Sequence, residues 1–297
     1  MEQSFRVFIE VVEAKSFSKA AERLYMTQPA VSQYVKSLES QLDAKLLDRS
    51  YKKIRPTKAG EIVYEHAKEM VHHQETMEQL IHDLFHEPKG ELAIGASYTF
   101  GEYVLPRIIA SLRIQYPGIH PTVTISNTQE IAELVERMKL DIGIVEGEVH
   151  LRGLQVEDVA EDEMKIVASR HHPLAGKEQV SVKELEQAMW ITREVGSGTR
   201  AATDKLFEQL SCYPEERMEF GSTQVIKESV EAGIGLSLLS LWTVRKEIEM
   251  ESLVVIPVEG GNVRRSFSIL TRKKLQQTKA TQAFKELLRT VISHYSD

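Results

Sequence analysis

Hydrogen-bonding side chains and a cation share one face of a helical segment close to the N-terminus. Five residues of the segment 28–42 form this face, namely Gln28, Ser32, Gln33, Lys36 and Ser37. Amides and hydroxyls hydrogen-bond the edges of bases, and lysine holds a phosphate, when a helix lies in the major groove of DNA. Taken alone, such a segment is equally an ordinary surface helix, so its neighbours in the chain decide the interpretation.

A strongly basic run, residues 45–60, follows this segment. Up to its last lysine it holds a single acid against six cations, which are Lys45, Arg49, Lys52, Lys53, Arg55 and Lys58. Apolar Leu46, Leu47 and Ile54 would anchor a two-stranded hairpin whose cations point at phosphates or into a minor groove. A basic run alone also suits a solvated surface or a localisation signal, but after a polar helix it favours a DNA-binding wing.

Three short helices must position this polar face. The apolar residues of MEQSFRVFIEVVE recur at helical spacing and predict a helix over residues 2–13. Ser16 and Ser18 are candidate N-caps of a second helix, SKAAERL, whose alanines let a neighbour approach closely. Thr27 is the candidate N-cap of the third helix, and Pro29 lies in its first turn, where the missing N–H costs nothing. The inward face of that third helix is expected to hold Ala30 or Val31, Val35, Leu38 and Leu42.

The net charge is unevenly distributed along the chain. Residues 1–60 hold eleven Lys and Arg against seven Asp and Glu, a balance of +4, although the whole chain of 297 residues carries −7. The remainder therefore carries −11. A basic head on an acidic body is expected of a protein whose head contacts a polyanion, and chance clustering is the alternative.

The N-terminal 60 residues resemble the DNA-binding domain of LysR-type transcriptional regulators. The resemblance is carried by SFSKAAERL, TQPAVSQ, the LE before the wing, LLDR and PTKAG. It implies a helix-turn-helix from Ser18 to Ser37 that binds double-stranded DNA. It further implies operator-facing residues at Thr27, Gln28, Pro29, Ala30, Ser32, Gln33 and Lys36, and wing residues at Arg49, Lys53, Arg55 and Thr57.

A long helix with a regular stripe is expected over residues 59–87. Its stripe residues are alternately four and three apart, namely Val63, Ala67, Met70, Gln74, Met77, Ile81 and Leu84. This is the spacing of a coiled-coil seam of about three heptads, in which the polar Gln74 can fix the register. Pairing of two copies would bring two reading heads together, as a pseudo-palindromic site requires. The alternative is that the stripe packs on its own domain.

Strand-like and helix-like segments alternate after the hinge EPKG, residues 87–90. ELAIGA, TVTISN and DIGIVEG read as strands with helices over 102–116 and 128–139, an order that predicts a parallel sheet flanked by helices. The pattern restarts after about residue 163 with MKIVAS, MWITREV, RMEFG, IGLSLLS, SLVVIPV and RSFSILTRK. Two such lobes resemble the periplasmic-binding-protein type of effector domain found in the same family.

The expected architecture is therefore α/β with three parts. Residues 1–58 form a winged helix-turn-helix, residues 59–87 a linker helix that dimerises, and residues 88–297 an effector-binding domain. Within that domain, residues 91–163 and 265–297 are expected in lobe I and residues 164–264 in lobe II. The segments DIGIVEG and ITREVGSGTR resemble the subgroup of the family linked to sulfur or carbon assimilation.

Three loops at the carboxyl ends of predicted strands carry groups that could hold a ligand, because ligands of such folds lie outside these ends. Each loop opens a helix, whose N-terminus favours an anion, although simple capping by Ser or Thr is the alternative role. The effector-binding candidates are Ser97, Tyr98, Thr99, Glu146, Gly196, Ser197, Thr199, Arg200 and Thr223. Glu146 could accept from a ligand donor or pair with Arg193 or Arg200, which opposes a purely anionic pocket.

Other classes of site lack their residues in this sequence. The single cysteine, Cys212, excludes a disulfide framework and a CxxC pair and suits the cytoplasm. No apolar run reaches the roughly 18 residues of a membrane helix, and the N-terminus lacks the pattern of a signal peptide. His82 and His86 are four apart, but no acid or cysteine completes a metal cluster, and no cofactor is expected. GxSxG, HExxH and Walker A motifs are absent.

The sequence thus predicts a cytoplasmic transcriptional regulator that binds DNA as a homodimer or homotetramer. A small anionic metabolite is the expected effector, and RNA polymerase is a further candidate partner. The rival hypothesis is an enzyme of the two-lobed binding-protein fold with an appended DNA-binding head, which turnover of a metabolite by pure protein would support. A third hypothesis is a constitutive architectural protein, which would show no thermal shift with any small anion.

Overall fold

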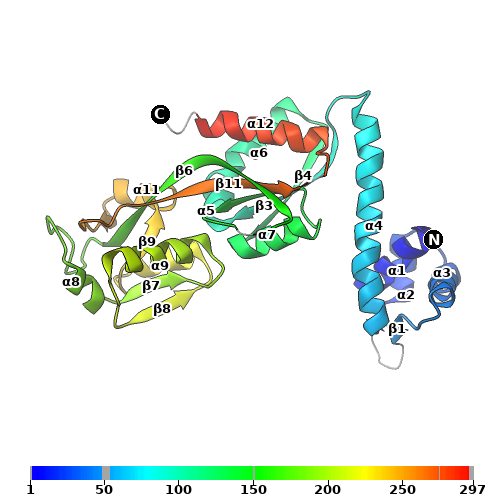
Figure 1. Ribbon diagram of the computed structural model, residues 1–297, viewed down its shortest axis with the longest axis horizontal. Coiled ribbons are helices and arrows are strands. Elements are labelled where there is room, and N and C mark those ends of the chain that lie inside the picture. The colour runs from blue at the N-terminus through cyan, green and yellow to red at the C-terminus, as the bar shows by residue number, and fades with distance from the viewer. Residues whose placement is uncertain (1, 49–53, 150, 274, 294–297) are drawn as a thin grey trace. The chain divides into compact units, whose positions relative to one another are not determined.

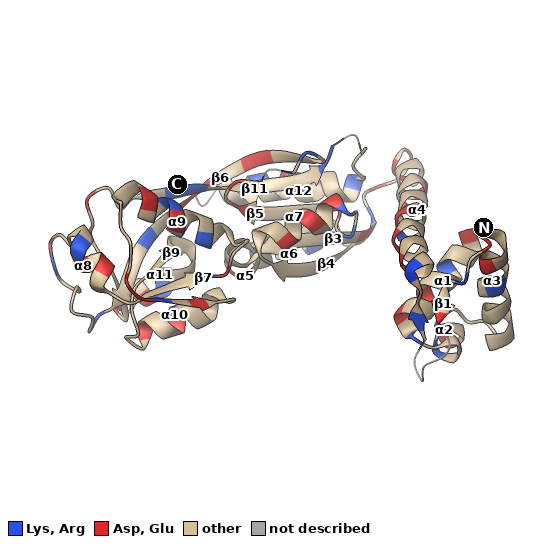
Figure 2. Cartoon of the chain, turned by 60° about the horizontal axis from the view of Figure 1, so that its bottom comes forward, with Lys and Arg blue, Asp and Glu red and all other residues tan. Residues whose placement is uncertain are grey.

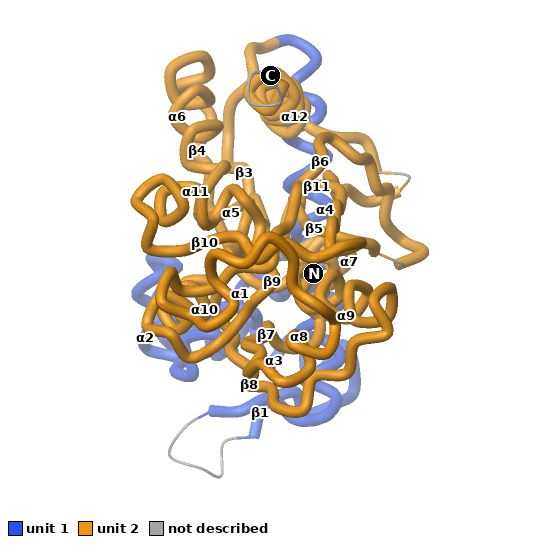
Figure 3. Tube along the Cα trace, turned by 90° about the vertical axis from the view of Figure 1, so that its left-hand side faces the viewer, with its two compact units in different colours: residues 1–85 blue, residues 86–297 orange. Residues whose placement is uncertain are grey.

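The computed structural model describes residues 2–48, 54–149, 151–273 and 275–293 (Figure 1). The chain divides into two compact units, residues 1–85 and residues 86–297, which Figure 3 distinguishes by colour. Among the helices of the described ranges, none combines the length and the apolar character needed to cross a bilayer.

The first unit is a winged helix-turn-helix with a long helix. Its elements are α1 (Glu2–Ala14), α2 (Phe17–Arg23), α3 (Gln28–Gln41), β1 (Leu47–Asp48), β2 (Arg55–Pro56) and α4 (Lys58–Asp83). The hairpin is antiparallel, with Leu47 opposite Pro56. Phe8 and Val11 of α1 pack with Val35 and Leu38 of α3 in one fully buried cluster. The predicted helical head with a basic hairpin is therefore confirmed.

Local signals at the helix ends differ from expectation at three residues. Ser16, and not Ser18, caps α2, since its Oγ accepts from the amide of Lys19 at 3.3 Å. Thr27 stands at the N-cap position of α3 but makes no capping bond with its side chain. Leu42, expected on the inward face, is 43% exposed, because α3 ends at Gln41 and the following residue leaves the helical stripe.

Helix α4 packs on the head along its first turns. Ala67 is fully buried in the same cluster as α1 and α3, and Val63 packs against that cluster. Here the structure agrees with the alternative that the stripe packs on its own domain, at least for Ala67, because helical spacing cannot tell a core of the same chain from a partner. Further along, Met70, Met77 and Ile81 are about half exposed. The helix ends at Asp83, before the expected end at residue 87.

The second unit is built on a mixed sheet. The strands of the unit are β3 (Gly90–Ser97), β4 (Ile119–Ser126), β5 (Ile142–Glu146), β6 (Leu154–Ser169), β7 (Trp190–Arg193), β8 (Arg217–Phe220), β9 (Ser237–Ser240), β10 (Leu253–Val255) and β11 (Val263–Arg272). Strands β7 and β8 pair with each other in parallel as a separate small sheet. The order β10-β6-β11-β5-β3-β4 forms the main sheet, to which β9 adds beside β6. The expected parallel sheet is corrected: β3 pairs in parallel with β4 and β5, but β11 and β6 run antiparallel to their neighbours.

Eight helices in the described part of this unit cover the strands (Figure 1). They are α5 (Tyr98–Tyr103), α6 (Leu105–Gln115), α7 (Thr128–Glu136), α8 (Val182–Gln187), α9 (Gly198–Leu210), α10 (Thr223–Glu231), α11 (Leu241–Glu249) and, last in the chain, α12 (Lys279–Ser293), which packs on α6. Lobe I here means β3–β5 with α5–α7 and α12, and lobe II means β7–β10 with α8–α11. Strands β6 and β11 pair along ten positions and pass through both lobes.

Each lobe has a core on either face of its strands, because neighbouring strand residues point in opposite directions. In lobe I, Ile144 of β5 packs with α6 and α12, whereas Val145 packs with α7. In lobe II, Ile166 of β6 packs with α9, whereas Val167 packs with α10. The polar carboxyl ends of the strands are thereby left facing the seam between the lobes.

Candidate functional site

The predicted reading face is present on α3 and open to solvent. Thr27, Gln28, Pro29, Gln33 and Lys36 are exposed, as is Ser18 at the start of the motif, and Ala30 and Ser32 are half-buried. Since Val31 and Val35 hold the opposite face of α3 in the core, these side chains point away from the head. The geometry suits insertion of α3 into a major groove.

Only some of the cations predicted for the wing lie within the described residues. Arg55 on β2 is exposed, whereas Arg49, Lys52 and Lys53 lie outside the described residues. Thr57 has a structural task, because its Oγ1 accepts from the amide of Gly60 at 3.0 Å and donates to the carbonyl of Lys45 at 2.6 Å. It therefore caps α4 and fastens the base of the wing.

A buried carboxylate, Glu39 on α3, also holds the wing and was missed as a site residue. Its Oε1 accepts from the amide of Leu46 at 2.9 Å and from that of Leu47 at 3.4 Å. The carbonyl of Leu46 in turn accepts from the amide of Thr57 at 2.9 Å. The reading helix and the first wing strand are thus tied through one side chain that is 5% exposed.

Charge along α4 is mainly acidic. The helix carries six acids and two lysines, which Figure 2 marks in red and blue. Two of the ion pairs join α4 to α1: Arg6 donates to Glu75 at 2.7 Å, and Lys68 donates to Glu13 at 2.9 Å. These pairs add to the packing of Ala67 and fix α4 to the head as far as Glu75.

In the second unit, a buried arginine that sequence reasoning missed joins the two lobes. Arg265 on β11 donates from Nε to Asp162 at 2.8 Å, and its Nη2 lies 3.7 Å from Glu146. It also donates to Thr199 of lobe II at 3.1 Å and to Thr99 of lobe I at 3.2 Å. Burial raises the pKa of Asp162, although Arg265 and Ser240 bond its carboxylate. Arg265 therefore compensates two buried acids at the centre of the seam.

Glu146 is committed to the protein itself. Its Oε1 accepts from the amide of Thr99 at 3.0 Å, at the start of α5, so this helix N-terminus already holds an anion. Its backbone carbonyl accepts from Thr128, and a side chain at Gly198 would collide with the same carbonyl. The expected pairing of Glu146 with Arg193 or Arg200 is corrected to Arg265.

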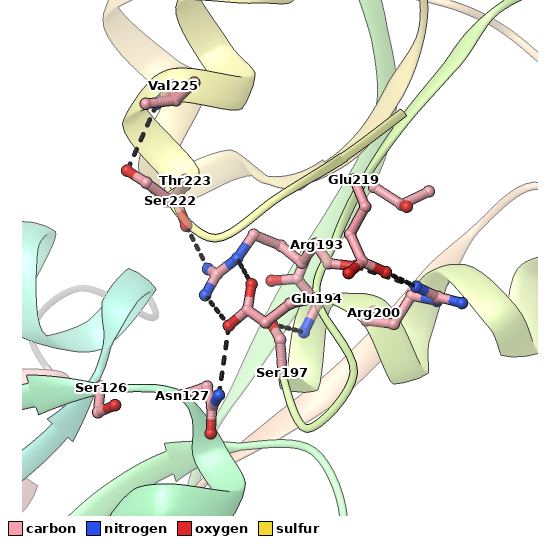
Figure 4. A network of polar contacts seen from close by, with 12 residues as sticks. Ser126, Asn127, Arg193, Glu194, Ser197, Arg200, Glu219, Ser222, Thr223 and Val225 are labelled. Atoms are coloured by element: carbon pink, nitrogen blue, oxygen red, sulfur yellow. Dashed lines mark hydrogen bonds and ion pairs between the residues drawn. The ribbon is translucent and has the colours of Figure 1, made fainter. Parts of the chain in front are cut away.

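A second buried arginine, Arg193 at the end of β7, binds the next residue of the chain (Figure 4). Its Nε and Nη2 donate to the two carboxylate oxygens of Glu194 at 2.7 and 2.8 Å. Its Nη1 donates to Thr223 at 2.8 Å, and its plane lies 4.5 Å from the ring centre of Tyr98. Burial opposes ionisation, but the bonds from Arg193 and Asn127 outweigh it and lower the pKa of Glu194.

The other predicted effector residues lie around these arginines. Ser97 donates to the carbonyl of Ile144, and Ser197 caps α9 by accepting from Thr199. Gly196 has a φ of 92°, which favours glycine, and its carbonyl accepts from the amide of Gln129 across the seam at 3.1 Å. Arg200 is taken by Asp204 and Glu219. The structure brings the three loops together but fills the space between them with the chain's own side chains.

Two open pockets remain at the edges of the seam. One of about 420 Å³ lies between residues 128–133, 148, 149 and 151 of lobe I and residues 195–204 of lobe II. Another of about 540 Å³ lies between α5 and α6 on one side and α10 and α11 on the other. A small molecule therefore has room at the edges of the seam, but neither pocket is lined by Arg193 or Arg265, and entry into the centre requires a side chain to move.

Groups for covalent or metal chemistry are not assembled in the described part of the chain. Burial raises the pKa of Cys212 to about 11, so its thiol stays neutral and unreactive. Among the described residues, no three His, Cys, Asp or Glu are placed to hold a metal ion.

Family models match both units. The model "Bacterial regulatory helix-turn-helix protein, lysR family" matches residues 3–61, and the model "LysR substrate binding domain" matches residues 85–293. The HTH-type transcriptional regulator CysL of Bacillus subtilis is 38% identical over 96% of this chain and 95% of its own length. The HTH-type transcriptional activator CmpR of Synechocystis is 33% identical over 96% and 93%.

Solved structures show the same architecture. The regulatory domain of CcmR from Synechocystis, solved in complex with 2-PG, has a TM-score of 0.64 and 28% identity over 68% of this chain and 97% of its own. Full-length CbnR in complex with its target DNA has a TM-score of 0.71 at 19% identity, over 98% and 99%, which supports the fold. The chain belongs to the LysR family of bacterial helix-turn-helix regulatory proteins.

Proposed function

We propose that this protein is a DNA-binding transcriptional regulator whose operator binding or promoter activation responds to a small anionic metabolite. The observation that carries the proposal is the combination of two features in one chain. The first unit exposes a polar face of α3 beside a wing, and the second unit buries two arginines in the seam between its two lobes. Such a regulator works in the cytoplasm, where the DNA is, and an activator of this kind would contact RNA polymerase.

The DNA-binding half rests on the exposed residues of the reading helix. Gln28 and Gln33 supply amides for base edges, Lys36 and Arg55 supply charge for phosphates, and Glu39 holds the wing against the helix. The residues Arg49, Lys52 and Lys53 are proposed as further phosphate contacts on their sequence alone. A helix and a wing used together read one half-site, and a dimer reads two.

The effector half rests on the charge of the seam. Arg193 and Arg265 are buried there beside hydroxyls of Thr99, Thr199 and Thr223. Buried guanidinium groups bind carboxylates and phosphates with paired hydrogen bonds. The CcmR regulatory domain was solved with 2-PG, which supports a small ligand in the same type of domain.

DNase footprinting on promoter fragments tests this function. We expect one protected region with two half-sites related by two-fold symmetry, and a change in its length or in DNA bending when an active small anion is added. Candidate anions are first chosen by thermal shift of the pure protein. Protection of no fragment, or a footprint that no stabilising anion changes, would count against the proposal.

We also propose that α4 pairs with a second copy through Met70, Gln74, Met77, Ile81 and Leu84. These residues follow one stripe of the helix, and four of them are exposed apolar side chains. A homodimer would bury this stripe, and a homotetramer would pair two such dimers.

Met77→Asp should weaken the dimer roughly a hundredfold, since each copy loses the burial of one Met side chain and gains a buried charge, at least about 3 kcal/mol together. Sedimentation velocity over a range of concentrations measures this change. Thr76→Asp adds the same charge one position away, off the stripe, and should leave the dimer intact. Equal behaviour of the two variants would refute the proposed seam.

A further inference from the structure

The carboxylates that neutralise the two seam arginines differ in their burial and in the number of hydrogen bonds that hold them. The side chain of Asp162 is fully buried and that of Glu146 is 4% exposed. Asp162 also accepts from Ser240 at 2.5 Å, and Glu146 accepts from the amide of Thr99. The side chain of Glu194, by contrast, is 25% exposed and belongs to a loop. If one acid gives way to a ligand, Glu194 is the one that can.

The guanidinium that Glu194 covers is fixed on its other sides. Thr223 accepts from Nη1, and the ring of Tyr98 lies against its plane. Glu194 occupies the edge formed by Nε and Nη2 with two nearly equal hydrogen bonds of 2.7 and 2.8 Å. This paired arrangement is the one that an arginine offers to a free carboxylate or phosphate. The edge is therefore a complete anion site with an internal occupant.

The occupant also reaches the opposite lobe. Asn127, which precedes α7 of lobe I, donates from Nδ2 to the Oε1 of Glu194 at 3.3 Å (Figure 4). A ligand oxygen in the place of Oε1 would take over this bond. Whatever binds at the edge of Arg193 therefore contacts both lobes at once.

We propose that Glu194 is a built-in competitor of the effector, and that the carboxylate or phosphate group of the effector binds Arg193 and Asn127 by displacing it. This inference rests on the proposed function, since it assigns the position and the chemical class of the ligand. A neutral or cationic molecule gains nothing at this edge, because it leaves Arg193 paired with Glu194. Glu194 thus sets both the affinity and the charge preference of the seam.

Arg200 is a second paired arginine with which Arg193 can be compared. It lies in the same loop-and-helix segment and is likewise paired, donating to Glu219 at 2.8 Å. Asp204 one helical turn away holds it as well, at 2.9 Å. Removal of the Glu219 charge therefore leaves Arg200 neutralised. Removal of the Glu194 charge leaves Arg193 in contact with the hydroxyl of Thr223 and the ring of Tyr98, and the carboxylate of Glu102 then acts on it through charge alone.

The test is a calorimetric titration of the full-length protein with malonate and with inorganic phosphate. Titration with sodium chloride at the same ionic strength is the control. Glu194→Gln keeps the size of the side chain and removes its charge, so the affinity for malonate or phosphate should rise about tenfold, the scale of one charge-assisted contact. Glu219→Gln makes the same change in net charge and should alter affinity less than about twofold. The double variant Arg193→Gln with Glu194→Gln should lose the gain.

Each outcome decides the proposal. A rise in Glu194→Gln that Arg193→Gln cancels supports it, and the better of the two probes tells a carboxylate from a phosphate effector. No rise, or the same rise in Glu219→Gln, overturns it. If Glu194→Gln does not fold, Glu194→Asp, whose shorter carboxylate keeps the charge, should still tighten anion binding. Operator binding by the wild-type protein is measured separately, so that its failure refutes the proposed function and not this inference.

Discussion

Replacement of Arg265 by alanine should destabilise the second unit by about 3–5 kcal/mol, the usual cost of removing one partner from a buried ion pair. The variant leaves Asp162 and Glu146 buried without their cation. It also removes the two hydrogen bonds by which Arg265 joins Thr99 of lobe I to Thr199 of lobe II.

Denaturant unfolding followed by tryptophan fluorescence measures this loss in the full chain. Both tryptophans, Trp190 and Trp242, belong to the second unit, so the signal reports on that unit. The control is Arg264→Ala at the neighbouring position, where an exposed arginine pairs with exposed Glu161 and should contribute about 0–1 kcal/mol. Similar losses in the two variants would show that the seam cluster is not a buried ion network.

The cost of Arg265→Ala should also depend on pH. Burial already raises the pKa of Asp162, and without Arg265 the carboxylate is held still less well in its charged form. A group with a raised pKa in the folded state binds a proton more tightly there than in the unfolded chain, so a fall in pH favours folding. The difference between the variant and the wild type should therefore shrink as the pH falls from neutral toward about 4, the ordinary pKa of an aspartate in the unfolded chain.

Glu39→Ala should cost about 2–4 kcal/mol locally and loosen the wing, because buried amides lose their acceptor. The amides of Leu46 and Leu47 are the groups concerned. Hydrogen exchange of these amides should become faster in the full-length variant. Glu22→Ala removes the same charge from an exposed position on α2 and should leave the exchange unchanged.

DNA binding by the Glu39→Ala variant is a second measurement of the same effect. If Glu39 holds the wing in place, its loss should reduce the number of phosphates contacted and so flatten the dependence of affinity on salt. A variant with rapid exchange at Leu46 but an unaltered salt slope would separate the wing from DNA binding and contradict this role for Glu39.

Local patterns in the sequence were sufficient for the head and for most strands. The helical spacing of apolar residues predicted α1 and α3, and serines and prolines indicated where helices begin. The pattern failed for the first half of β6, where VEDVAEDE reads as a polar loop although it pairs with β11. Charged residues are tolerated there because they have partners: Asp162 pairs with Arg265 of β11, and Glu157 pairs with Arg289 of α12.

The centre of the candidate site could not be predicted from the sequence, because strand pairing brings its residues together. Arg265 and Asp162 are far apart in the chain and meet only because β11 and β6 pair in a register that sets these two residues opposite each other. Ala67 shows the converse limit, since its heptad position is equally consistent with a partner helix and with the head of its own chain. Register and choice of partner are decided by tertiary packing, which single-sequence periodicity does not contain.

The most direct test of the central claim compares the wild type with Gln33→Ala on two DNA duplexes, the footprinted operator fragment and a random sequence, over a series of salt concentrations. Gln41→Ala, at the far end of α3, is the matched control. We predict that wild-type affinity falls steeply with salt on both duplexes, and that Gln33→Ala loses about 1–3 kcal/mol of preference for the operator while Gln41→Ala keeps it. Equal affinity of the wild-type protein for both duplexes, or binding that does not respond to salt, would contradict the account.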